Sequence, residues 1–298
     1  MGSSLTSLYR EHMYSWAYHH VVFESPPLPP LTNDYEPQQL WERIDPVMQR
    51  KEDIRAILLY CHLPDQSVRT ESEALHTLAE EMQDMLLLVW EYPGCGHRRD
   101  PKTPRATTHQ GYVKATWEQL QQEAIGVLDR VRTVYPLLPV AIMGRGVGSN
   151  LALHMVCERP TQVKAVLVHD VWTSWTDFLW GVDWGRHAYR RLALYWWEPR
   201  VFDTVEEVQR KLRKDKYQGH LFFSYNRFDV DMPVMTVYKQ LVQPLMEEFG
   251  EDQVKWLCSP VYKPWTDVVI QYYYPKLRQW LDLVPPPVVS SSSNNRPQ

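Results

Sequence analysis

The stretch that decides the fold is Leu138-Pro-Val-Ala-Ile-Met-Gly144-Arg-Gly146-Val-Gly148-Ser-Asn-Leu-Ala-Leu-His154. It begins with apolar residues, continues with a glycine-dense segment and ends in a run of helical character. This order predicts a short buried strand, a sharp turn and the start of a helix. Glycines suit such a turn because the strand and the helix pass close together, and because the apex occupies strained φ/ψ values.

The composition indicates one large domain with a full core. The chain has 298 residues, of which 44% are hydrophobic and 23% are charged. Its formal net charge of −4 argues against nucleic acid as a partner. No apolar run approaches the ~18 residues of a membrane span, and no signal peptide is recognisable.

The sequence offers no metal or cofactor motif. The cysteines are too scattered for metal ligands, and we expect them to be reduced thiols in an intracellular protein. They are Cys61, Cys95, Cys157 and Cys258. The turn from Gly144 to Gly148 lacks the Lys-Ser/Thr ending of a phosphate-binding loop. We therefore expect neither a metal nor a cofactor.

Strands and helices are expected to alternate along the chain. Short apolar runs predict buried strands, and apolar residues at helical spacing predict the helices between them. Besides the opening stretch, the expected strands are residues 54–60, 85–90, 163–169, 220–224 and 254–258. The expected helices include residues 70–82, which follow a Thr-x-x-Glu capping box, 116–135, and a closing helix from about 272 to 283. This alternation predicts an α/β fold with a mostly parallel central sheet flanked by helices.

Both ends of the chain are expected to lie outside this domain, which we place at residues 37–284. Residues 1–36 form an N-terminal extension that leads into the domain through a Pro-rich strap. Its start, Met1-Gly2-Ser3-Ser4-Leu5-Thr6, fits the myristoylation pattern M-G-x-x-x-[ST] at Gly2, and an unmodified disordered start fits as well. Myristoylation would give a cytoplasmic protein a peripheral membrane contact. Residues 285–298 are rich in Pro and Ser and predict a disordered tail.

Short motifs follow the expected strands in a characteristic order. They are His62-Leu63, Tyr92-Pro93-Gly94-Cys95-Gly96, Gly144-Arg145-Gly146-Val147-Gly148, Thr173-Ser174-Trp175-Thr176-Asp177 and Phe202-Asp203-Thr204. In their order and spacing, residues 54–283 resemble the α/β-hydrolase superfamily, and most closely its depalmitoylase-like branch. The resemblance implies the α/β-hydrolase fold with a small aromatic-rich cap at about residues 171–200.

The resemblance also implies where a catalytic triad would lie, in the chain order serine, acid, histidine. Gly146 stands at the serine position of the G-x-S-x-G elbow, and a glycine has no side chain that could attack a substrate. Asp229 fits the acid position, with Asp231 as its alternative. Pro264 stands at the histidine position, and no histidine follows His220.

The oxyanion hole is altered as well. In the family motif H-G, the glycine lets the backbone approach the oxyanion, and Leu63 replaces that glycine here. We therefore interpret the chain as a catalytically inactive α/β-hydrolase-like protein that acts as a binding or scaffolding module. The alternative is a divergent acyl-ester or thioester hydrolase that works without a serine and uses His62 or Cys95.

Other polar residues near the expected site favour structural roles. Ser149 lies one turn into the helix, where a serine usually caps or packs. His97 lies near the expected mouth of the site and could act as a base only in a rebuilt geometry. His169 follows a strand and is expected to be a buried histidine with its hydrogen bonds satisfied.

The expected cap is dense in aromatic residues. The candidates for binding a protein partner are Trp172, Trp175, Trp180, Trp184, Trp196 and Trp197. One interpretation is that these rings fill the space left by the triad and form core, because tryptophans are mostly buried. The other is that several stay exposed beside neighbouring arginines, since tryptophan and arginine are enriched at binding hot spots.

Overall fold

The structure is a computed structural model. It describes residues 41–44, 54–63, 71–92, 117–171, 205–214, 217–226, 234–259 and 264–283. The predicted features that lie outside these residues include Gly2 with the whole N-terminal extension, Cys95, His97, the motifs at 173–177 and 202–204, the cap tryptophans, Asp229, Asp231 and the C-terminal tail.

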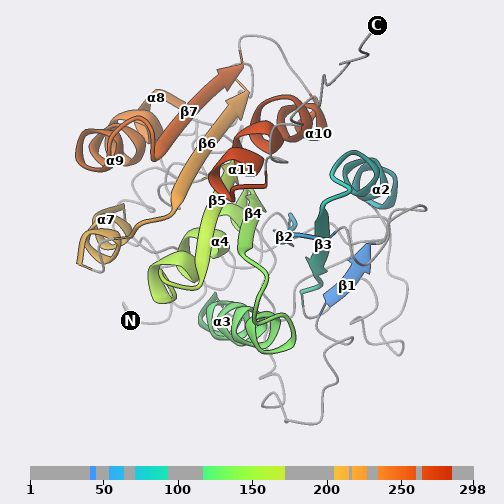
Figure 1. Ribbon diagram of the computed structural model, residues 1–298. Coiled ribbons are helices and arrows are strands. Elements are labelled where there is room, and N and C mark those ends of the chain that lie inside the picture. Colours follow the sequence, from blue (N-terminus) through green and yellow to red (C-terminus); the bar gives the residue numbers. More distant parts are fainter. Residues whose placement is uncertain are drawn as a thin grey trace, which may run out of the picture.

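Within the described residues, a seven-stranded sheet forms the centre of the molecule (Figure 1). Its strands are β1 Trp41–Ile44, β2 Ala56–Cys61, β3 Met85–Trp90, β4 Val140–Arg145, β5 Val163–His169, β6 His220–Asn226 and β7 Val254–Ser259. They lie in the order β1-β3-β2-β4-β5-β6-β7, and the neighbouring strands are parallel except for β1 and β3. The mostly parallel sheet is confirmed, whereas the antiparallel edge strand β1 has no counterpart among the expected strands.

Helices cover both faces of the sheet, because parallel strands need crossover connections that return over one face or the other. Helices α3, α4, α7 and α9 pack on one face, and α2 and the closing helix pack on the other (Figure 1). The bounds are α2 Ser72–Glu81, α3 Trp117–Val134, α4 Val147–Glu158, α7 Val205–Lys214, α8 Val234–Val237, η5 Tyr238–Val242, α9 Gln243–Phe249, α10 Trp265–Val268, η6 Val269–Tyr273 and α11 Tyr274–Trp280. The labels η5 and η6 mark π-helical segments.

The closing helix begins earlier than expected. Its segments α10, η6 and α11 run from Trp265 to Trp280, whereas the sequence pattern places its start near residue 272. The residues before 272 include Val268, Val269 and Ile270, and β-branched side chains have low helix propensity. Tertiary packing overrides that propensity, since Val268 and Val269 are buried.

The core alternates between the two faces along each central strand. On β2, Ile57 and Leu59 face the helices α3 and α4, while Leu58 and Tyr60 face α2 and the closing helix. All six residues of β2 are buried, as expected for a parallel strand covered on both faces. The continuous apolar runs read from the sequence are therefore strands of the sheet centre.

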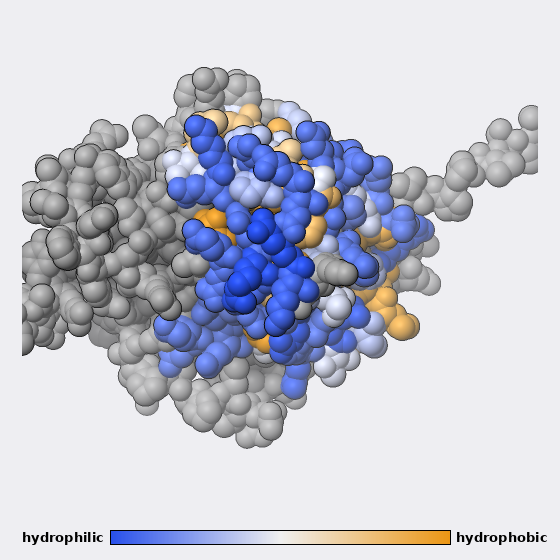
Figure 2. All heavy atoms as spheres, turned by 90° about the vertical axis from the view of Figure 1, so that its left-hand side faces the viewer, coloured by the Kyte–Doolittle hydropathy of each residue, from blue (hydrophilic) through white to orange (hydrophobic). Residues whose placement is uncertain are grey.

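The outer surface around α7 and α9 is charged. Figure 2 shows this face as predominantly hydrophilic. Helix α7 buries Val208 and Leu212 and directs charges outward, where the Lys211 ammonium lies 2.8 Å from a Glu158 carboxylate oxygen. The neighbouring Arg213 pairs with Glu248 of α9. This face is accordingly a solvated surface that covers the core.

Candidate functional site

The turn between β4 and α4 has the predicted strand–turn–helix geometry. Gly146 lies between the last strand residue and the first helix residue, with φ of 52° and ψ of −120°. L-residues rarely adopt such values. The Gly146 N–H donates to the His169 carbonyl at 2.9 Å, and the Gly146 carbonyl accepts the Ser149 N–H at 2.9 Å. The apex of the elbow is therefore held at both of its backbone polar groups.

The flanking glycines are required by packing. A Cβ on Gly144 would lie 2.3 Å from the carbonyl oxygen of Gly148. A Cβ on Gly148 would lie 2.2 Å from the carbonyl oxygen of Cys61, at the end of β2. These separations are far below van der Waals contact. The two glycines thus seat α4 against β2 and β4, whatever residue stands at the apex.

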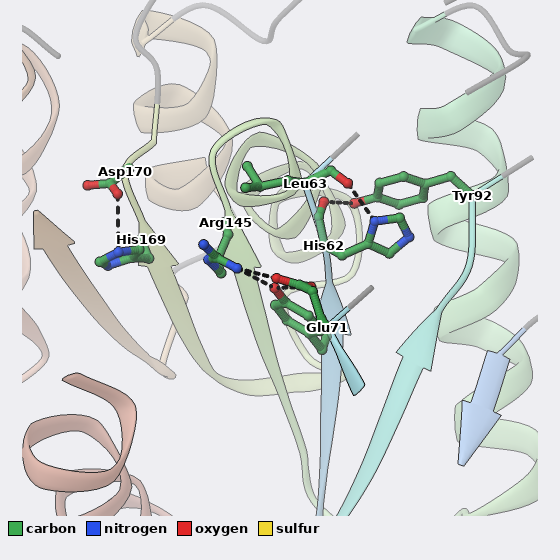
Figure 3. A network of polar contacts seen from close by, with 8 residues as sticks. His62, Leu63, Glu71, Tyr92, Arg145, His169 and Asp170 are labelled. Atoms are coloured by element: carbon green, nitrogen blue, oxygen red, sulfur yellow. Dashed lines mark hydrogen bonds and ion pairs between the residues drawn. The ribbon is translucent and has the colours of Figure 1, made fainter. Parts of the chain in front are cut away.

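Arg145, which precedes the apex, belongs to a buried polar group (Figure 3). Its guanidinium donates from Nη1 to Glu71 and to the Tyr60 hydroxyl oxygen, the latter at 3.3 Å. The Tyr60 hydroxyl donates to the other carboxylate oxygen of Glu71 at 2.9 Å. The arginine side chain is 14% exposed and the glutamate side chain 5%, so the ion pair is largely removed from water.

The charges in this group support one another. Burial alone would lower the pKa of Arg145, but neighbouring Tyr60 and Glu71 outweigh it and raise that pKa above its ordinary value. Burial raises the pKa of Tyr60 well above its ordinary value. Arg145 is therefore a fixed cation, and Tyr60 stays a neutral hydroxyl that can donate to the carboxylate.

The closing helix meets Arg145 beside the apex. The guanidinium carbon of Arg145 lies 4.4 Å from the ring centroid of Trp265, a cation–π distance. Trp265 also stacks on Tyr60, with ring centroids 5.4 Å apart and planes inclined by 12°. Pro264, at the expected histidine position, is the exposed N-cap of α10 and immediately precedes this tryptophan. A proline side chain can neither accept nor deliver a proton.

His62 is buried on the other side of β2. Figure 3 shows its ring turned toward Tyr92 and away from Arg145. The rings of His62 and Tyr92 stack at a centroid distance of 4.0 Å, and His62 Nδ1 lies 2.6 Å from the carbonyl oxygen of Leu63. Burial above all, against the raising effect of that carbonyl, lowers the pKa of His62 to about 4. The ring is neutral, and its Nδ1–H donates to the carbonyl.

His169 is satisfied by two neighbours, as expected. Its Nδ1 lies 2.8 Å from the Ser224 hydroxyl oxygen, and its Nε2 lies 3.1 Å from an Asp170 carboxylate oxygen (Figure 3). Burial and then the charge of Arg145 lower the pKa of His169 to about 3. The neutral ring therefore donates from Nε2 to Asp170 and accepts from Ser224. Ser224 is 1% exposed, so the serine of this serine–histidine–aspartate set is buried.

Ser149 has the packing role expected of it. It is fully buried, and its hydroxyl donates to the His169 carbonyl at 2.8 Å. The same carbonyl accepts the Gly146 N–H, so the end of β5 fixes the elbow through two donors. The residues that sequence reasoning missed are Tyr60, Glu71 and Trp265. They carry no motif, and distant segments bring them together.

The described residues hold no group of three or more His, Cys, Asp or Glu that could bind a metal ion. In the part of the chain that the structure covers, no helix has the length and apolar character needed to cross a membrane.

Solved structures resemble this chain in fold. The protein TT1662 from Thermus thermophilus matches with a TM-score of 0.55 at 18% identity, covering 82% of this chain and 94% of its own. A highly thermostable carboxyl esterase from Bacillus coagulans matches with a TM-score of 0.51 at 10% identity, covering 81% of this chain and 99% of its own. No protein-family model and no curated protein matches the sequence. The sheet order, the elbow between β4 and α4 and these similarities show that the chain has the α/β-hydrolase fold.

Proposed function

We propose that this protein is a catalytically inactive α/β-hydrolase-like protein that acts as a binding or scaffolding module. One observation carries the proposal. The elbow is fully formed, yet the residue at its apex is Gly146, at φ of 52° and ψ of −120°. The place from which an elbow presents its nucleophile therefore carries no side chain.

The histidine and oxyanion positions support the same conclusion. Pro264 cannot act as a base, and the neighbouring Trp265 lies against Arg145. Leu63 replaces the glycine that would let backbone approach an oxyanion. Asp229, proposed at the acid position, would then be a remnant without a histidine to orient.

The alternative, a divergent acyl-ester or thioester hydrolase, has less support. Its candidate base His62 is fully buried, holds its Nδ1 against the Leu63 carbonyl and faces Tyr92. A base must reach the proton it abstracts, and this ring is turned away from the elbow. The candidate nucleophile Cys95 lies outside the described residues.

The finer assignments rest on sequence motifs. The order of motifs supports a place in the depalmitoylase-like branch. The pattern at Gly2 supports N-myristoylation of a cytoplasmic protein with peripheral membrane contact. The cap tryptophans support a protein partner. The positions proposed for that contact are Trp172, Trp175, Trp180, Trp184, Trp196 and Trp197.

Activity probes test the proposal directly. The purified full chain is incubated with a fluorophosphonate, with an iodoacetamide probe and with short-chain p-nitrophenyl esters. We expect no fluorophosphonate labelling and no ester turnover above that of heat-denatured protein. A Cys95→Ala variant serves as the matched control for the iodoacetamide probe. Turnover that disappears in Cys95→Ala or in His62→Gln would establish the divergent hydrolase instead.

A further inference from the structure

The Arg145 side chain joins four segments that are distant in the sequence. Tyr60 lies on β2, Glu71 precedes α2, Arg145 ends β4 and Trp265 begins α10. The hydroxyl, the carboxylate and the indole ring all contact the one guanidinium. Through Trp265, the closing helix is linked to the charge at the end of β4. The guanidinium is therefore the common element between the elbow and the start of that helix.

The Glu71 carboxylate accepts hydrogen bonds from this group rather than from the N–H groups of its own helix. Glu71 is the N-cap residue of α2, but its side chain makes no capping hydrogen bond there. It accepts from Arg145 and from Tyr60 instead. Both charged side chains are largely buried, so each charge stabilises the other where there is little water to solvate it.

Trp265 connects this ion pair to the closing helix. It is the first residue of α10, and its ring contacts both Tyr60, by stacking, and the guanidinium, by a cation–π contact. The first turn of α10 is otherwise closed by the Pro264 carbonyl, which accepts the N–H groups of Asp267 at 3.0 Å and Val268 at 3.3 Å.

We propose that the Arg145–Glu71 ion pair is a latch that holds the first turn of the closing helix against the elbow. When the pair is intact, Trp265 rests on the guanidinium of Arg145, the residue before Gly146. When the pair is broken, this first turn is free to move away from Arg145 at the end of β4. The latch does not depend on whether the elbow is catalytically inactive.

Hydrogen exchange measured by mass spectrometry on the full chain tests the latch. In Arg145→Ala, the amides of Asp267 and Val268 should exchange roughly tenfold faster than in the wild type, because the cation–π and charge contacts that seat this turn are gone. Amides in the centre of β5 should keep their protection. Free guanidinium, added well below denaturing concentrations, should restore slow exchange by occupying the vacated place between Glu71 and Trp265.

Arg159→Ala is the matched control. Arg159 forms an ion pair with Asp129 at 3.0 Å at the other end of α4, and its removal should leave exchange in residues 264–273 unchanged. Trp265→Ala should show the fast exchange but no rescue by guanidinium. If Arg145→Ala does not fold, Arg145→Lys is measured instead. Lysine is suitable because it lacks the planar face and the forked N–H donors of the guanidinium, so the contacts to Trp265 and Glu71 are weakened. Unchanged exchange in 264–273, or an equal acceleration in β5, would overturn the latch.

Discussion

Replacing Gly146 by alanine should destabilise the protein by about 1–2 kcal/mol. The φ of 52° and ψ of −120° at this position lie in a region that costs an L-residue about 1–3 kcal/mol. Alanine also restricts the unfolded chain, and this raises the free energy of unfolding by about 0.4–1 kcal/mol. The net loss follows because the backbone cannot relax, since Gly146 is held by the His169 carbonyl and by the Ser149 N–H.

Urea unfolding followed by circular dichroism measures this loss as a lower midpoint at an unchanged slope. Gly126→Ala is the matched control, because Gly126 lies inside α3 without a positive φ. The same chemical change there should stabilise the protein by about 0.5–1 kcal/mol. A Gly146→Ala variant as stable as the wild type would show that the apex carries no strain, and the argument from its φ/ψ values would be refuted.

The other predictions concern chemistry, targeting, the cap and pH. Gly146→Ser should not turn over p-nitrophenyl esters at the rate of an active serine hydrolase, because an unassisted hydroxyl is a weak nucleophile; turnover near that rate would reveal a hidden base. Gly2→Ala should shift the protein toward the soluble fraction in cell fractionation, and unchanged fractionation with an unmodified N-terminus by mass spectrometry would remove the lipid anchor. Replacing Trp196 and Trp197 together by alanine should weaken partner capture while the melting temperature stays nearly constant; a large fall in melting temperature would assign the rings to the core. Acidification should destabilise the protein, because the folded state holds the pKa of His169 at about 3 whereas the unfolded chain binds the proton near 6.5. The stability contributed by this ring is fully present above pH 6.5 and is lost as the pH falls toward 3, by up to ~1.4 kcal/mol per pH unit. In His169→Gln the urea midpoint should therefore fall less steeply with acidification than in the wild type, and an equally steep fall would contradict the prediction.

Local patterns were sufficient for the central part of the fold. The apolar run before Gly144 and the spacing of the glycines predict the strand, the turn and the helix, because each feature depends on residues close in the chain. The helix of residues 70–82 is confirmed as α2, but its N-cap is Glu71 rather than the residue 70 that the capping box predicts. That carboxylate pairs with Arg145, a partner 74 residues away, which no capping pattern records.

Two further differences have the same origin. The edge strand β1 is short, and it exists through its pairing with β3, in which Trp41 lies opposite Trp90. The closing helix starts at Trp265 despite the β-branched residues Val268 and Val269, whose burial compensates their low helix propensity. Pairing and burial depend on segments that are distant along the chain, so propensity alone cannot supply them.

The sequence by itself determined the α/β arrangement, the elbow and the absence of a side chain at its apex, because these depend on the order and spacing of neighbouring residues. The proposed sites at Gly2, Asp229 and the cap tryptophans remain predictions. Only the tertiary structure decided what surrounds the apex. The parallel register places the ends of β2 and β4 side by side, and this brings Tyr60, Glu71 and Trp265 onto Arg145. A buried charge is stabilised by groups that lie close to it in the folded chain. Because these groups come from distant segments, no local sequence pattern predicts the contact.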